Sequence, residues 1–553
     1  MRVTRVLPLA LPLALLALST TLPAQRPDTD GRDATRAAQA ASATVMRAHL
    51  EFLADDALEG RKPGTRGGEL AALYIKAQFE RLGLQPAGED GTYYQKVPII
   101  TLTPTPSLAV GKPGDAAATL RYPADYVLWS MRDTTSVRLS GDLVFVGHGI
   151  VAPKWQWNDY EGVNAKGKVV VVLANDPGLR DSTIFRGKIL TYYGRWTYKI
   201  EEARRQGAAG ILLVHTTETA TYPWTTVQSS WTGPQVRVEQ PAASLLVAGW
   251  LEHEAAAKLF AASGHDFDSL AASAYRRGFT AVPLGARATA AVTSQVRRSE
   301  TQNVLARLPG RGRLAEEAVL IGGHYDHFGI GAPVNGDSIY NGAEDNASGT
   351  AAVLAAAEAF VESGVRTRRS LVFIAFAAEE AGLLGSQAFV NRPTIPLKQI
   401  AAILNLDVMN LYGRTRDASA LGNNQSTLGE AFTRAAAAEG LRVTVDEDAL
   451  IRGGYFRSDH FPFARAGVPG TSIEGGDAFV GKPEGYGQQQ RDEYVAKRYH
   501  QPSDQIQPWW SYDGGLQQLR VTMRMAVDVA DAASTPTWSR GSEFREVGEA
   551  RRR

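Results

Sequence analysis

The residues of this chain that could do chemistry are histidines and carboxylates in five short segments of its second half. From these segments we take two histidines, three carboxylates and one further glutamate as candidate ligands and base. The segments read Gly-Gly-His324-Tyr-Asp326-His, Ala-Glu-Asp345-Asn-Ala-Ser-Gly, Phe-Ala-Ala-Glu379-Glu380-Ala-Gly-Leu-Leu-Gly-Ser, Asn-Leu-Asp407-Val and Tyr499-His500-Gln-Pro-Ser-Asp504. This inventory suits two divalent metal ions that share a bridging carboxylate, with a free base beside them.

Each of these residues, taken alone, has an ordinary structural explanation. Asp345 precedes an expected helix and could be its N-cap, and His324 could be a hydrogen-bonded core histidine. His500 could be a simple loop residue. Glu379 and Glu380 could favour the first turn of a helix, where the macrodipole attracts negative charge. The two glutamates, however, follow an almost wholly apolar stretch, so their burial and mutual repulsion would be costly without a cation.

Taken together, the acidic residues favour metal binding over separate structural roles. Asp345, Glu380 and Asp407 contribute three negative charges and Glu379 a fourth, whereas no neighbouring motif supplies a matching set of lysines or arginines. Buried carboxylates without compensation are very costly, and two zinc ions would bring four positive charges. Asp326 strengthens this interpretation, because a carboxylate near a ligating imidazole can accept its second N–H.

The elements predicted to position these residues alternate between apolar strands and helices. We expect strands at 319–323, 371–376 and 403–407, and an alanine-rich helix at 347–361. The fully apolar strand at 371–376 is typical of a covered parallel sheet. Ligands of open α/β sheets bind beyond the carboxyl ends of the strands, where the motifs begin. The sequence therefore predicts an α/β fold with a mixed, largely parallel sheet covered by helices.

Composition and charge exclude several classes of site and partner. Hydrophobic residues make up 44% of the chain and charged residues 21%, which is ordinary for a globular protein. The net charge of +1 gives no reason to expect nucleic acid or an anionic membrane as partner. The chain contains no cysteine, which excludes a Cys-ligated zinc site, a Cys nucleophile and a disulfide framework.

The first residues are typical of a signal peptide, predicted at 1–24. Arg2 and Arg5 precede an apolar run at 7–18, and Ala24 offers a small residue for cleavage. The apolar run is short for a membrane span, so a signal anchor is the less favoured alternative. We therefore expect an exported protein, periplasmic or secreted, with no membrane span after signal removal.

The ordered motifs resemble the co-catalytic zinc peptidase family that contains bacterial leucyl-type aminopeptidases, glutamate carboxypeptidase and the transferrin receptor. The segment 376–386 is the most specific part of the resemblance, which extends over about 40 to 135 and 290 to 535. The β-rich stretch between them resembles the protease-associated domain that many members carry as an insert.

The resemblance, with the 553-residue length, implies a multi-domain chain. A discontinuous zinc peptidase domain would comprise 41–139 and 286–535, interrupted by the protease-associated-like insert at 140–285. A linker at 25–40 and a disordered tail at 536–553 would complete the chain. We expect the insert to shape access to the site and to carry no chemistry.

The resemblance also implies a ligand set for two zinc ions per chain. Asp345 would bridge the two metals. His324 and Asp407 would complete one site, and Glu380 and His500 would complete the other.

Three further residues receive roles from the same resemblance. Glu379 would act as general base and then as general acid. Asp326 would support His324 without binding metal. His460, in the segment Arg457-Ser-Asp-His460-Phe-Pro-Phe, would lie near the substrate oxyanion.

The signal peptide and the resemblance together predict an exported zinc-dependent exopeptidase acting on peptides, and we favour an aminopeptidase. A carboxypeptidase of the glutamate type would need a clamp for the substrate carboxylate, for which Arg452 and Arg457 are the plausible residues. A glutaminyl cyclase would bind one zinc ion. A non-catalytic, receptor-like protein would have lost site residues that are all present here. An unrelated two-metal amidohydrolase is the remaining alternative.

Overall fold

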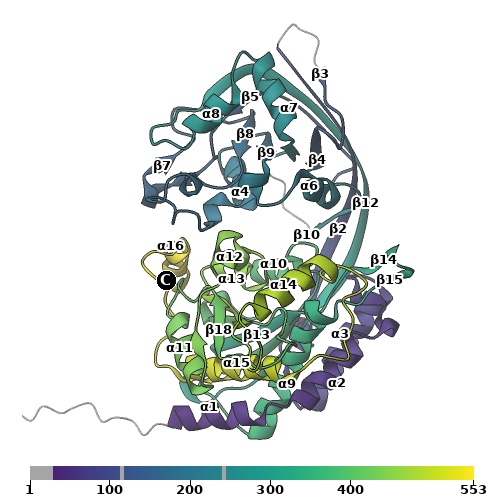
Figure 1. Cartoon of the computed structure of the whole chain (residues 1–553), viewed down its shortest axis with the longest axis vertical. Helices are drawn as coiled ribbons and strands as arrows, with labels where there is room; N and C mark the ends of the chain where they lie inside the picture. The colour runs from purple at the N-terminus through teal and green to yellow at the C-terminus, as the bar shows by residue number, and fades with distance from the viewer. Residues whose placement is uncertain (1–28, 113–117, 239–244) are drawn as a thin grey trace, which may run out of the picture.

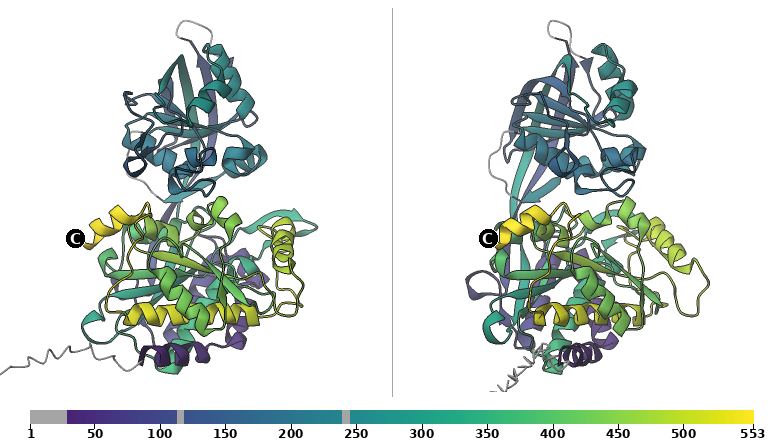
Figure 2. Two further views of the ribbon diagram at one scale, coloured as in Figure 1. Left: turned by 60° about the vertical axis from the view of Figure 1, so that its left-hand side comes forward. Right: turned by 90° about the vertical axis from the view of Figure 1, so that its left-hand side faces the viewer.

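The computed structural model describes residues 29–112, 118–238 and 245–553. The predicted signal peptide lies outside the described residues. Two parts of the chain are stacked along its long axis and are joined on one side by two long strands (Figure 1). These strands, β2 (Tyr94–Gly111) and β12 (Val282–Leu308), pair antiparallel from Tyr94↔Val304 to Gly111↔Arg287. They run from the lower part, which carries the metal-site motifs, into the upper part, and Figure 2 shows the same junction from two further sides.

The sheet of the lower part has the strand order β19-β18-β20-β17-β13-β16-β12. Its central strands β20, β17, β13 and β16 are parallel. Strand β18 runs antiparallel to β20 but parallel to β19, and β12 runs antiparallel to β16. The bounds are β13 (Ala318–His324), β16 (Ser370–Phe376), β17 (Ile400–Asn405), β18 (Asp417–Leu421), β19 (Arg442–Val443) and β20 (Gly470–Gly475). Every residue of β13, β16 and β17 is buried, as continuous apolar runs predict. The predicted α/β fold with a largely parallel sheet is confirmed.

Helices cover both faces of this sheet. The larger group packs its small and apolar residues into one core with β13 and β16. This group comprises α1 (Thr29–Ala40), α2 (Ala43–Leu53), α3 (Arg66–Arg81), α9 (Ser348–Ser363), α11 (Leu428–Ala438) and α15 (Asp513–Asp531). On the opposite face, α10 (Leu384–Asn391) and α13 (His460–Arg465) bury Phe389 and Phe463. The alanines of α9 let this helix lie close under the strand ends that carry the site.

The upper part is built on a second run of parallel strands. It continues from β12 through β5, β8, β9 and β11 to an antiparallel edge strand, β4. The bounds are β4 (Tyr126–Ser130), β5 (Ser136–Phe145), β8 (Val169–Leu173), β9 (Gly210–Val214) and β11 (Val247–Leu251), with helices α4 (Trp196–Arg205), α6 (Trp224–Trp231) and α7 (His253–Ala262) around them. Because β4 pairs with β11, this sheet includes residues before 140.

Both ends of the described chain differ from the expectation of a linker and a disordered tail. Residues 29–40 form α1, which packs against α15, and the last residues include α16 (Arg545–Arg552). Trp538 and Phe544 are buried, and Trp538 Nε1 donates to the Gly467 carbonyl at 3.0 Å. In each terminal segment a few apolar residues pack against the rest of the protein. The polar average composition of these segments did not indicate this packing. Among the described residues, no helix combines the length and apolar character that crossing a membrane requires.

Candidate metal centre

Three neighbouring parallel strands deliver the first part of the site. His324 is the last residue of β13, and Asp407 follows the end of the adjacent β17. His324 Nε2 lies 3.3 Å from Asp407 Oδ1. On the other side of β13, strand β16 ends at Phe376, opposite His324, and leads into Glu379 and Glu380. The carboxyl edge of the sheet therefore gathers a histidine and three carboxylates.

Asp345 joins the two predicted histidine ligands. Its Oδ1 lies 3.3 Å from His324 Nε2, and its Oδ2 lies 3.3 Å from His500 Nε2. One carboxylate thus faces two imidazoles, which is the arrangement that a bridging ligand requires.

Two features hold the loop that carries Asp345. The Asp504 carboxylate accepts the backbone N–H of Glu344 at 2.9 Å and that of Asp345 at 3.1 Å. Gly342 adopts a positive φ of 55°, and a Cβ there would lie 2.4 Å from the His327 ring. The loop therefore needs glycine at 342 and an acceptor at 504, whereas the sequence had assigned no role to Asp504.

Glu380 completes the cluster on the side of His500. Its Oε2 lies 3.3 Å from His500 Nε2, and its Oε1 lies 2.7 Å from His327 Nδ1. Burial and Asp345 act to raise the pKa of Glu380, but His327 and His500 outweigh them and lower it. The contact with His327 was missed by sequence reasoning, although the residue directly follows Asp326 in the first motif. The repeated histidine in that motif was the available signal.

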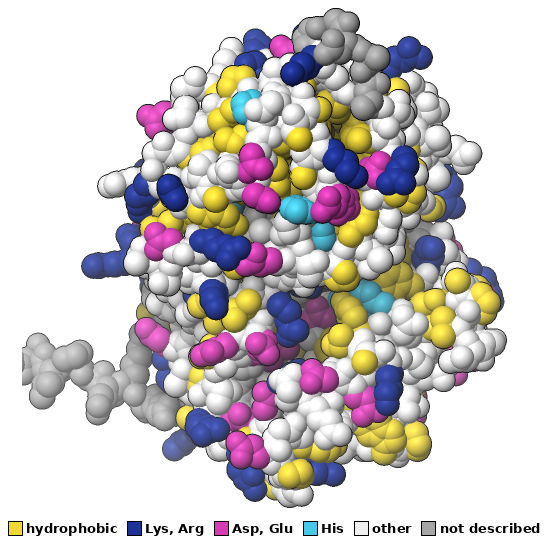
Figure 3. All heavy atoms as spheres, turned by 45° about the horizontal axis from the view of Figure 1, so that its top comes forward, with side chains coloured by type: hydrophobic (Ala, Val, Ile, Leu, Met, Phe, Trp, Pro, Cys, Tyr) yellow, Lys and Arg dark blue, Asp and Glu magenta, His cyan; other side chains and the backbone are white. Residues whose placement is uncertain are grey.

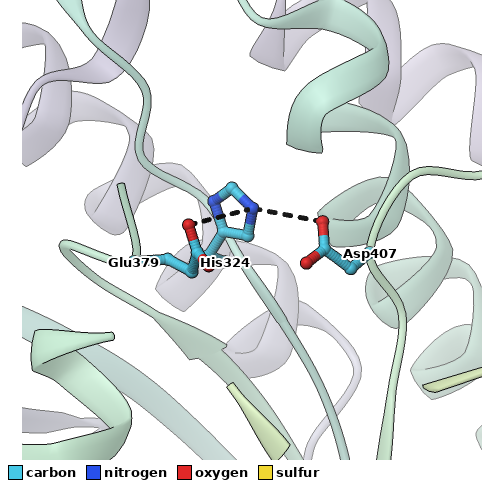
Figure 4. Close-up of side chains that lie close together, drawn as sticks. All are labelled: His324, Glu379 and Asp407. Carbon is cyan, nitrogen blue, oxygen red and sulfur yellow. Dashed lines mark ion pairs between the residues drawn. The ribbon is translucent and has the colours of Figure 1, made fainter. Parts of the chain in front are cut away.

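Glu379 lies on the other side of the cluster, as Figure 4 shows together with His324 and Asp407. Its Oε2 is 3.9 Å from His324 Nε2, farther than the Asp345 and Asp407 oxygens. Burial raises the pKa of Glu379 well above its usual range, and the charges of Glu380 and Asp407 raise it further against the opposing effect of His324. This carboxylate therefore accepts a proton more readily than an exposed glutamate.

Asp326 organises the two glutamates through their backbone. Its Oδ1 accepts the N–H of Glu379 at 3.0 Å, and its Oδ2 accepts that of Glu380 at 3.4 Å. The distance from Asp326 Oδ1 to His324 Nδ1 is 3.8 Å, whereas this nitrogen lies 3.3 Å from the Asp326 carbonyl oxygen. Burial raises the pKa of Asp326 to about 6. Asp326 thus contacts His324 mainly through its backbone and fixes the Glu379–Glu380 segment through its side chain.

The donors fit a pair of divalent ions. Two groups of nitrogen and oxygen atoms converge within 4.8 Å, His324 with Glu379 and Asp407, and His324 with Asp345 and Glu380. The His500 Nε2 atom is buried without a hydrogen-bond partner, yet it lies between carboxylate oxygens of Asp345 and Glu380. A buried polar atom of this kind implies an absent partner, and imidazole and carboxylate are ligands that zinc accepts.

Arg61 supplies a buried positive charge that the motifs did not reveal. Its guanidinium is fully buried and donates to four backbone carbonyls, those of Leu53 at 2.5 Å, Tyr325 at 2.7 Å, Asn341 at 2.5 Å and Gly342 at 2.9 Å. Burial lowers its pKa to about 10, while Asp326, Asp504, Asp345 and Glu380 act to raise it. No neighbouring motif supplies a matching set of lysines or arginines, but this single arginine comes from the first helices of the chain, 264 positions before Tyr325.

His460 belongs to neither converging group of ligand atoms in the described chain. It begins α13 fully buried, its ring centroid 4.7 Å from that of Tyr455, and burial lowers its pKa to about 4. Its neighbour in the motif, Ser458, instead contacts the cluster, because Ser458 Oγ donates to Asp407 Oδ2 at 2.5 Å. The oxyanion role of His460 stays a prediction.

Comparison with known proteins supports the same family. Residues 303–520 match the model of Peptidase family M28, which confirms the resemblance drawn from the motifs. The chain is 27% identical over 240 residues to leucine aminopeptidase 1 of Pyrenophora tritici-repentis, covering 42% of this chain and 56% of that protein. It is 31% identical over 177 residues to leupeptin-inactivating enzyme 1 of Streptomyces exfoliatus, covering 32% of this chain and 36% of that protein. The chain therefore spans about half, or less, of these relatives.

Several solved structures align over most of the chain. An aminopeptidase from Aneurinibacillus sp. strain AM-1 covers 91% of this chain and 97% of its own, with 19% identity and a TM-score of 0.47.

Proposed function

We propose that this protein is a zinc-dependent aminopeptidase that hydrolyses the N-terminal peptide bond of its substrates. The observation that carries the proposal is the carboxylate of Asp345 between His324 and His500, with Glu379 beside the cluster. The match of the site-bearing segment to Peptidase family M28 supports it.

The proposed ligand set follows the geometry around Asp345. His324 and Asp407 would hold one zinc ion and Glu380 and His500 the other, with Asp345 between them. Ions held there would lower the pKa of a bound water and polarise the scissile carbonyl.

Glu379 is the proposed general base. It would take a proton from the attacking water on its carboxylate oxygen and deliver that proton to the leaving amine. Its position beside the proposed ligands, with Oε2 3.9 Å from His324 Nε2, supports this role. The hydrogen bond from the Glu379 backbone N–H to Asp326 would keep the Glu379 carboxylate directed toward the cluster.

The acidic surroundings favour recognition of a free α-amine. Asp345, Glu379, Glu380 and Asp407 are gathered at one edge of the sheet, and their four negative charges would offset those of two zinc ions. The loaded centre would then offer carboxylate oxygens to an amine and no surplus positive charge to a carboxylate. We further propose that the residues between the two long strands form a protease-associated-like domain.

The direct test of the proposal compares peptides with free and acetylated N-termini in the presence of zinc. Release of the first residue should be lost on acetylation. Cleavage of acetylated peptides at the C-terminal bond would instead support the carboxypeptidase. Conversion of N-terminal glutamine to its cyclic form without hydrolysis would support the cyclase.

We also propose export, on the basis of the first 24 residues. Protein recovered from the periplasm or medium should begin at Gln25. Recovery only in the cytoplasm, with the leader intact, would contradict export.

A further inference from the structure

The upper part of the molecule contacts the lower part close to the candidate metal centre. The ring of Tyr192, from the upper part, lies 5.2 Å from that of Phe461, centroid to centroid, and its backbone N–H donates to Glu543 Oε1 at 3.1 Å. A Cβ added at Gly453 would lie 2.7 Å from Leu190 Cδ2, so these backbones are tightly apposed. The segment that follows Tyr192 is therefore held against the lower part.

Two arginines meet at this contact. Arg195 directly follows the short helix Tyr192–Gly194 and is the N-cap residue of α4. Arg457 directly follows Phe456, whose ring centroid lies 6.1 Å from that of Tyr192. Burial, and then the positive charge of Arg457, lower the pKa of Arg195 to about 10. Tyr222 lies near both charges, since Arg195 and Arg457 each act to lower the pKa of its hydroxyl while burial raises it.

Neither arginine has an acidic partner within the part of the chain that the structure describes. Arg195 Nε is buried without a hydrogen bond, and Arg457 is exposed. Arg465, on the same interface, is instead paired with Glu201 at 2.6 Å. Like charges held together in a partly buried place are unfavourable unless an anion joins them. The pair is therefore suited to a bound anion.

Arg457 connects this pair to the metal centre through the backbone. Arg457 directly precedes Ser458, whose hydroxyl donates to Asp407 Oδ2, and consecutive Cα atoms are about 3.8 Å apart. Figure 3 shows a recess between the two parts of the molecule, in which histidine and acidic side chains are visible. The positive charge of these arginines, at the edge of the centre, would orient a molecule that carries an amine at one end and a carboxylate at the other.

We propose that Arg195 and Arg457 form a clamp for the free C-terminal carboxylate of short peptides whose N-terminal bond lies at the metal centre. This inference rests on the proposed aminopeptidase function and narrows its substrates to di- and tripeptides. An extended residue spans about 3.3–3.6 Å, so the C-terminal carboxylate of a longer peptide would lie beyond arginines at the edge of the centre. Guanidinium groups fork onto carboxylates, which gives the clamp its selectivity.

The test uses the full chain loaded with zinc and peptides of two, three and five residues, each with a free or an amidated C-terminus. For the di- and tripeptides, kcat/KM should be at least about tenfold higher for the free acid, as expected for loss of one charge-assisted bond. The pentapeptide should show no difference. Arg457→Gln and Arg195→Gln should each bring the acid-to-amide ratio close to one, mainly through KM.

Arg452→Gln is the matched control, because Arg452 is exposed on the same segment and forms no ion pair with any described residue. The wild-type ratio should persist in this variant. Arg195→Lys provides a second test if Arg195→Gln fails to fold, since lysine keeps the charge but loses the fork, and the ratio should still fall. Thermal melting would verify that each variant is folded.

The possible failures are distinguishable. Equal rates on acids and amides in the wild type would overturn the clamp and leave the aminopeptidase intact. Dependence on an acidic side chain in the second residue, rather than on the C-terminus, would also overturn it. No release of the first residue from any unblocked peptide would overturn the proposed function itself.

Discussion

Asp326 Oδ1 accepts the backbone N–H of Glu379 at 3.0 Å. This bond links the end of β13, where His324 lies, to the segment that follows β16. The two residues are hydrogen-bonded although they are 53 positions apart in the chain. The position of the proposed base thus depends on a carboxylate that belongs to another strand.

We predict that Asp326→Asn lowers kcat while the zinc content stays unchanged. The amide keeps one acceptor but loses the charge, and loss of a residue that orients a metal site typically costs about 10–100-fold. Steady-state kinetics and elemental analysis would check this. A wild-type kcat would show that the bond to Glu379 does not limit turnover.

We predict that Glu379→Gln abolishes turnover and retains both metal ions. Glutamine is nearly isosteric but cannot take a proton, and general acid–base catalysis contributes about 10²–10⁴-fold. Glu380→Gln is the matched variant and should instead weaken zinc binding, because Glu380 lies 3.3 Å from the unpartnered His500 nitrogen. If Glu379→Gln lost zinc and Glu380→Gln retained it, Glu379 would be the ligand and Glu380 the base.

Elemental analysis of the purified, zinc-saturated protein should give nearly two equivalents per chain. The reason is that Asp345 lies between His324 and His500. A site for a single ion would not require a carboxylate between two histidines. Activity should fall on chelation and return with zinc. Full activity at one equivalent would favour the cyclase.

Replacement of Arg61 should destabilise the lower part of the molecule. Arg61→Met would remove a buried charge and its bonds to four carbonyls, and breaking such a site costs about 3–5 kcal/mol. Urea unfolding would measure the change. Arg66→Met is the control: its side chain is 74% exposed, so the free energy of unfolding should change by no more than about 0.5 kcal/mol.

Stability should decrease in mild acid because of His49. Burial lowers the pKa of His49 to about 4, whereas the unfolded chain has the ordinary value of 6.5. Between these values the unfolded state binds more protons, so the contribution is fully present above pH 6.5 and is lost as the pH falls toward 4. The loss amounts to about 3 kcal/mol at most.

The comparison for this prediction is His49→Gln, because glutamine can still bond the Tyr74 hydroxyl, which lies 2.9 Å from His49 Nδ1, but does not titrate. As the pH falls from 8 to 4, the free energy of unfolding of the wild type should decrease relative to that of the variant by up to about 3 kcal/mol. Parallel curves would show that another group controls the acid sensitivity.

The sequence by itself determined the elements that carry the motifs and the chemistry of their residues. Strands β13, β16 and β17 and helix α9 lie where the apolar patterns predicted them, because a buried strand or helix must be apolar along its own length. The residue types in the motifs likewise defined a histidine–carboxylate inventory, because the capacity to bind a metal ion belongs to the side chain itself.

The tertiary structure decided which distant residues complete that inventory. Arg61 reaches the Tyr325 carbonyl across 264 positions, and Arg195 meets Arg457 only because the two parts of the molecule touch. His327 and Asp504 also gained their partners through the fold. Contacts between distant segments produce no periodic pattern in the sequence, because they depend on the tertiary fold. Hydrophobic periodicity indicates only which residues of a single helix or strand are buried.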